Sequence, residues 1–143
     1  MNSHIKNLSR VEKIQYLALL KEKANREKYN KIKSMFPDTG ELRRELYPKH
    51  LEFFTAGAYH RERLFMAGNR VGKTEGGGTE CSYHLTGNYP DWWDGRKFDK
   101  PIRAMVAGDT SETTRDILQK KLLGGKYGTP EWGTGLKIGR AHV

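Results

Sequence analysis

Eight residues, 67–74, limit the choice of fold more than any other stretch of the chain. They depart by one residue from the pattern Gly-x-x-x-x-Gly-Lys-Ser/Thr, because Ala67 stands where the pattern has glycine. The apolar run 64–67 leads into the stretch, and a helical pattern starts at Thr74. A loop between a strand and a helix can turn its backbone N–H groups inward beside the positive end of the helix dipole. The stretch therefore predicts a phosphate-binding loop, although a surface Gly-Lys-Thr turn is the alternative.

The side chains of this loop have expected roles in holding a nucleoside triphosphate and Mg²⁺. Gly72 supplies conformational freedom, Lys73 would reach the β- and γ-phosphates, and the hydroxyl of Thr74 would bind Mg²⁺. Arg70 leaves two interpretations open, a solvated charge or a cation that stabilises charge during phosphoryl transfer. Lys73 and Arg70 are thus the candidate catalytic residues, and Thr74 is the candidate magnesium ligand. The predicted ATP-binding set is Ala67, Gly68, Asn69, Arg70, Val71, Gly72, Lys73 and Thr74.

Hydrophobic periodicity predicts a helical lead segment followed by alternating strands and helices. Ser9 and Glu12 have the spacing of a capping box at the start of the first helix. Asp109 and Glu112 repeat that spacing before the last helix. Alternation of strands and helices is typical of a parallel α/β sheet. The predicted elements are helical regions over 9–35 and 41–62, buried strands over 64–67 and 102–107, and helices over 74–85 and 109–123.

Three consecutive glycines, at positions 76–78, weaken the helix predicted after the loop. Each glycine inside a helix costs about 1 kcal/mol relative to alanine. Such a run is expected where the helix approaches another group closely, or where a ligand holds the first helical turns.

The charge of the chain favours a polyanionic partner such as nucleic acid. Lysine and arginine number 26 against 17 aspartate and glutamate, which gives a net charge of +9. A merely soluble basic surface is the alternative.

No apolar run approaches the roughly 18–20 residues that span a bilayer, and the first ten residues lack a secretory signal pattern. Cys81 is the one cysteine, so it cannot form an internal disulfide, which fits a reducing cytosol. We expect its side chain to act as a small buried residue of the helix after the loop.

Two further features leave alternatives open. Trp92 and Trp93 could stack on nucleobases or anchor a loop against the sheet, and the anchor is favoured because only one basic pair follows them. Asp109 could be a magnesium-binding carboxylate or a helix cap, and its spacing to Glu112 favours the cap. The chain has no apolar strand ending in two acidic residues, and no Asn-Lys-x-Asp motif for guanine. A GTPase is therefore disfavoured.

Three ordered blocks of the chain resemble the large terminase subunit of tailed double-stranded DNA phages. The blocks read RLFMAGNRVGKT over 63–74, HLTGNYPDWW over 84–93 and TSETTRD over 110–116, and the resemblance runs from about residue 8 to residue 136. It implies a packaging ATPase joined to a nuclease that cuts concatemeric genomes. It also implies ATP and Mg²⁺ as cofactors, with double-stranded DNA, a small terminase subunit and a portal ring as partners. The implied location is the host cytoplasm, transiently at the portal of the procapsid.

Residue by residue, positions 68–74 match the Walker A loop of this family, with Lys73 and Thr74 in the phosphate and magnesium roles. Many members place a glutamine shortly upstream to read adenine, whereas this chain has His50 at the matching position. The Walker B pair, the coupling motif and the nuclease carboxylates have no counterpart here. We therefore expect the complete parent to be an ATPase and endonuclease, and this chain by itself to be inactive.

The resemblance and the periodicity together predict an α/β fold, with a helical segment before the first part of a P-loop NTPase domain of the RecA/ASCE type. The predicted parts are a helical lead segment over 1–40, a partial P-loop ATPase domain over 41–136 and a non-native tail over 137–143. The tail, KIGRAHV, resembles a common sequencing-library adapter translated in frame, so we interpret the chain as a fragment. The alternatives are a DNA- or portal-binding helical module on a degenerate nucleotide fold and an unrelated small P-loop kinase.

Overall fold

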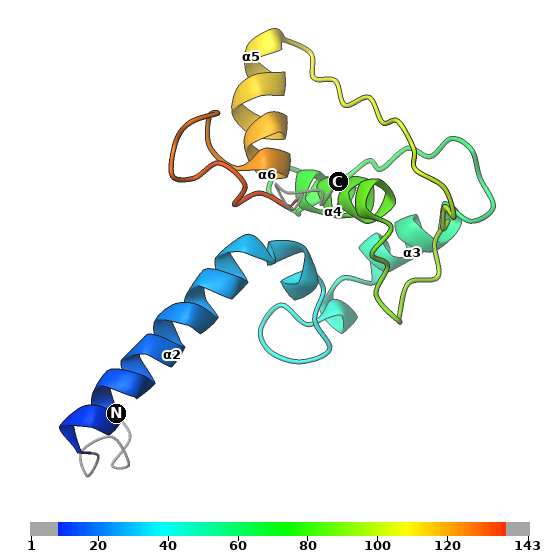
Figure 1. The fold of residues 1–143 in the computed structure, drawn as a ribbon. Helices are drawn as coiled ribbons and strands as arrows, with labels where there is room; N and C mark the ends of the chain where they lie inside the picture. The colour runs from blue at the N-terminus through cyan, green and yellow to red at the C-terminus, as the bar shows by residue number, and fades with distance from the viewer. Residues whose placement is uncertain (1–8, 137–143) are drawn as a thin grey trace.

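The computed structural model describes residues 9–136 as a set of helices joined by long loops (Figure 1). The predicted non-native tail, residues 137–143, lies outside the described residues. None of the described helices is long and apolar enough to cross a membrane. The elements are α2 (Arg10–Tyr29), η1 (Lys31–Ser34), η2 (Arg44–Leu46), α3 (Pro48–Ala56), α4 (Lys73–Thr86), α5 (Ser111–Thr113), η3 (Thr114–Gln119) and α6 (Lys120–Leu123).

Residues 9–136 contain no β-strand, so the predicted α/β fold with a parallel sheet is wrong. The apolar runs 64–67 and 102–107 are not helical, but neither pairs with another segment. Leu64 is 81% exposed and Met105 is 93% exposed, so these runs are not buried either. A strand is defined by hydrogen bonds to a neighbouring strand. The apolar pattern identifies two runs with the composition of strands, but it does not identify a segment with which either could pair.

The predicted capping box at the start of α2 is confirmed. The backbone N–H of Glu12 donates to the Ser9 hydroxyl at 3.3 Å, and the backbone N–H of Ser9 donates to the Glu12 carboxylate at 2.7 Å. These bonds hold the pKa of Glu12 below its ordinary value.

Helix α2 ends at Tyr29, before the predicted boundary at residue 35, and the short 3₁₀ helix η1 follows. Residues 10–27 are exposed all around the helix, and α2 extends away from the other helices (Figure 1).

Replacing Ser9 with alanine should destabilise α2 by about 1 kcal/mol, because the first helical turn loses its side-chain acceptor. Tertiary packing cannot compensate, since residues 10–27 of α2 are exposed. Far-UV circular dichroism should show a lower helix content than in a Ser34→Ala control, which lies beyond α2. Because folding lowers the pKa of Glu12, the stabilisation exists above the ordinary glutamate pKa and disappears as the pH falls through the lowered value. Equal helix content in the two variants at neutral pH would contradict this role.

An aromatic core joins η1, α3, α4 and the loop over 87–98. Its buried members are Ile32, Phe36, Phe54, Tyr83 and Trp93. The ring of Phe54 lies 5.3 Å from that of Phe36 and 5.0 Å from that of Trp93, between centroids. The indole N–H of Trp93 donates to the carbonyl of residue 96 at 3.0 Å. The predicted anchoring role is therefore confirmed for Trp93, although it anchors the loop to helices and not to a sheet.

The last helical stretch begins one residue later than its predicted cap. Thr110 is the N-cap, because its hydroxyl accepts the backbone N–H of Thr113 at 3.1 Å. The carboxylate of Asp109 accepts the backbone N–H of Thr110 at 3.0 Å. Asp109 thus has a local structural contact, but the prediction that it caps the helix is wrong. The stretch continues as η3, a π-helix, and ends with α6, which contacts α4.

Candidate phosphate-binding loop

The loop over 67–72 leads directly into α4, as the sequence predicted, although no strand precedes it. Helix α4 begins at Lys73 and ends at Thr86, close to the predicted bounds of 74–85. Gly72 is its N-cap and has a left-handed backbone with φ of 86°. Arg70 also has a positive φ, 62°, which is uncommon for a residue with a side chain. Two left-handed residues within three positions turn the chain sharply at the start of the helix.

The ammonium group of Lys73 lies inside this turn. Its Nζ donates to the carbonyl of Ala67 at 2.7 Å and to the carbonyl of Gly68 at 2.6 Å. The loop thus closes over the cation of the first helical residue. The motif predicts that Lys73 reaches the phosphates of a nucleotide, and in this structure its ammonium group is bonded to two carbonyls of the loop.

Several hydrogen-bonding groups of the loop have no partner within the described part of the chain. The backbone N–H groups of residues 69–73 have no acceptor among residues 9–136. The guanidinium of Arg70 and the hydroxyl of Thr74 are exposed and form no hydrogen bond or ion pair with the described residues. These groups, together with Lys73 and the N-terminal end of α4, give the loop an excess of donors and positive charge.

The acidic residue nearest the loop is paired. Glu75, in the first turn of α4, forms an ion pair with Lys121 of α6. Lys73 and Thr74 also line a cavity of about 360 Å³, whose apolar walls include Val106, Leu118 and Leu122. Cys81 lies along the same cavity and is only half-buried, so it is more exposed than expected. The pairing of Glu75 reduces its repulsion of an anion at the loop.

His50 packs beneath the loop with its ring against α4. A Cβ at Gly76 would lie only 2.9 Å from Cδ2 of His50, and a Cβ at Gly72 would lie 3.3 Å from Nε2. The ring also meets that of Phe65 edge to face, with 5.0 Å between centroids. His50 is therefore buried between α3 and the start of α4. The close approach expected of the glycine run is confirmed at Gly76, whereas Gly77 faces open space.

Arg63 links the segment that leads into the loop to α3 and α4. The sequence patterns assigned no role to this residue. Its guanidinium donates to Glu80 of α4 at 2.9 Å and to the carbonyl of Phe53 in α3 at 2.6 Å. It also lies 4.4 Å from the centre of the Phe53 ring. Glu80 is almost fully buried, so this ion pair joins α3, α4 and the incoming segment. No sequence signal could have found it, because its partners are 10 and 17 positions away.

No family model and no solved structure matches the chain. The large terminase subunit of Salmonella phage P22 is 33% identical to it over 136 residues. That match covers 87% of this chain but 26% of the phage protein, so the chain spans about a quarter of the length of this relative. The predicted resemblance to a large terminase subunit is therefore confirmed, and the chain is similar over most of its own length to the large terminase subunit of this Salmonella phage.

Proposed function

We propose that residues 67–74 bind ATP with Mg²⁺, and that the chain provides the ATP-binding part of a terminase large subunit. The observation that carries the proposal is the position of Lys73. It is the first residue of α4, and its ammonium group lies inside a loop that Arg70 and Gly72 turn sharply. A cation held in this way, beside free backbone N–H groups, suits the β- and γ-phosphates of a nucleotide.

The chemistry follows from the groups that the loop leaves free. The backbone N–H groups of residues 69–73 would donate to phosphate oxygens, and Lys73 would exchange the carbonyls of Ala67 and Gly68 for phosphate oxygens. The hydroxyl of Thr74 would bind Mg²⁺. Arg70 has no partner among the described residues, so its guanidinium is available to stabilise charge on the phosphates.

The wider role comes from the relative and from the charge of the chain. The phage P22 protein is named as the large subunit of a terminase. We propose that the complete protein uses ATP to package double-stranded DNA into a capsid and cuts concatemeric genomes, with a small terminase subunit and a portal ring as partners. The net charge of +9 supports a polyanionic partner. The expected location remains the host cytoplasm and, transiently, the procapsid portal.

Replacing Thr74 with alanine should reduce the gain in ATP affinity that Mg²⁺ provides, because the metal loses a protein oxygen. We expect this gain in affinity to fall by roughly two- to tenfold, which is the contribution of one hydrogen bond between uncharged groups. Isothermal titration with ATP, in Mg²⁺ and in EDTA, measures this gain. Thr74→Ser should retain it because the hydroxyl remains, and Thr55→Ala on the exposed face of α3 is the matched control. If all variants gain equally from Mg²⁺, Thr74 is not the ligand.

A further inference from the structure

One histidine ring contacts the chain at both ends of the loop over 67–72. Before the loop, the ring of Phe65 meets that of His50 edge to face, with 5.0 Å between centroids. After the loop, a Cβ at Gly72 would lie 3.3 Å from Nε2 of His50, and a Cβ at Gly76 would lie only 2.9 Å from its Cδ2. The spacing between the two ends of the loop therefore depends on this ring.

The aromatic core holds His50 in place. His50 lies in the first turn of α3 and is 7% exposed. Its ring lies 5.8 Å from that of Phe36 and 5.6 Å from that of Tyr47, between centroids. Phe65 is also held, because its ring stacks on that of Phe53 at 4.7 Å. A ring packed in this way acts as a fixed spacer, since close-packed side chains have little room to shift.

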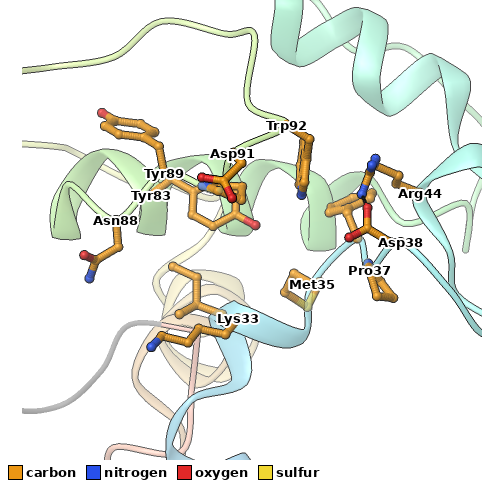
Figure 2. A pocket seen from close by; sticks show the side chains of 13 residues that line it. Lys33, Met35, Pro37, Asp38, Arg44, Tyr83, Asn88, Tyr89, Asp91 and Trp92 are labelled. Atoms are coloured by element: carbon orange, nitrogen blue, oxygen red, sulfur yellow. Dashed lines mark ion pairs between the residues drawn. The ribbon is translucent and has the colours of Figure 1, made fainter.

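A cavity of about 890 Å³ lies next to the same aromatic core (Figure 2). Phe36 and Trp92 both line it, and Figure 2 shows Trp92 with Arg44 to one side. His50 is not among the lining residues, so a molecule in this cavity would meet Phe36 and not His50. Because His50 is nearly buried and lies outside this cavity, it has little surface with which to contact a nucleobase.

We propose that His50 is a positioning residue of the phosphate-binding loop and does not read the base. Its ring sets the spacing between Phe65 and the first turn of α4, and this spacing directs Lys73 and the backbone N–H groups of residues 69–73 toward one point. The inference rests on the proposed ATP site and deepens it, because it assigns the effect of His50 to the phosphates. A loop whose ends shift should lose hydrogen bonds to the phosphates, whichever base the nucleotide carries.

The test is equilibrium binding of Mg·ATP, Mg·GTP and inorganic tripolyphosphate to the full chain, below the unfolding midpoint of each variant. His50→Ala removes the spacer and should weaken all three by about tenfold, which corresponds to one hydrogen bond to a charged group. Trp93→Phe is the control, because Trp93 packs in the same core against Phe54 and Tyr83. It should bind all three ligands as the native chain does.

Gly76→Ala tests the same contact without removing the ring. The added Cβ would crowd His50, so binding of tripolyphosphate should weaken by about three- to tenfold. Gly77→Ala is the matched control, since a Cβ one residue further along α4 meets nothing within 4 Å. In the His50→Ala background, Gly76→Ala should cost no further affinity, because the ring that it would crowd is gone.

The ligands and controls separate the possible outcomes. The inference is overturned if His50→Ala binds tripolyphosphate as tightly as the native chain, or if Gly76→Ala binds it as tightly as Gly77→Ala. It is also overturned if His50→Ala weakens ATP alone, since His50 would then read the base, or if Trp93→Phe loses as much affinity as His50→Ala. If the native chain binds tripolyphosphate no better than Lys73→Ala does, the proposed ATP site itself fails, and this inference fails with it.

Discussion

Replacing Lys73 with alanine should weaken ATP binding by roughly 10- to 150-fold. The substitution removes the cation whose Nζ lies within the loop, 2.7 Å from the carbonyl of Ala67 and 2.6 Å from that of Gly68. A hydrogen bond to a charged group contributes about 1.5–3 kcal/mol, and 1.4 kcal/mol corresponds to a tenfold change in affinity. The backbone N–H groups of residues 69–73 would remain, so weak binding of the phosphates is expected to persist.

Isothermal titration with Mg·ATP measures this loss. Lys97→Ala is the control, because it removes an exposed lysine outside the loop and lowers the net charge by the same amount. The comparison separates the specific contact of Lys73 from general electrostatic attraction. Increasing salt should weaken ATP binding to Lys97→Ala and to the native chain in parallel. An unchanged affinity in Lys73→Ala would remove the basis for an ATP site at residues 67–74.

The features that sequence reasoning predicted are those determined by neighbouring residues. The capping box of Ser9 and Glu12 and the junction between the loop and α4 depend on contacts within a few positions, and both lie where the sequence placed them. Local chemistry of this kind can be read from one stretch of chain. Helix α2 ends earlier than predicted, at Tyr29, and the residues that follow it turn into η1 so that Ile32 and Phe36 pack into the aromatic core.

The features that sequence reasoning missed depend on distant partners. The runs 64–67 and 102–107 have the apolar character of strands, yet neither pairs within residues 9–136, and the predicted sheet is absent. The ion pair of Arg63 with Glu80 and the packing of His50 on Gly76 join residues 17 and 26 positions apart. Periodicity indicates which side of a helix or strand is apolar, but it does not indicate which segment of the chain packs against that side.

Replacing Trp93 with alanine should lower the free energy of unfolding by about 3–5 kcal/mol. Trp93 is 2% exposed, and its ring lies 5.0 Å from that of Phe54 and 5.1 Å from that of Tyr83, between centroids. The truncation leaves a cavity between α3, α4 and the loop over 87–98, and it leaves the carbonyl of residue 96 without its indole donor. Domains of this size have about 5–15 kcal/mol of stability in total, so much of it would be lost.

Urea unfolding followed by circular dichroism measures the change, with Tyr59→Ala as the control because that tyrosine is 81% exposed. The control should shift stability by no more than about 0.5 kcal/mol. Trp93→Phe should fall between the two, since it keeps an aromatic ring against Phe54 but loses the bond to the carbonyl of residue 96. If Trp93→Ala moves the unfolding midpoint no further than Tyr59→Ala does, the loop is not anchored by this ring.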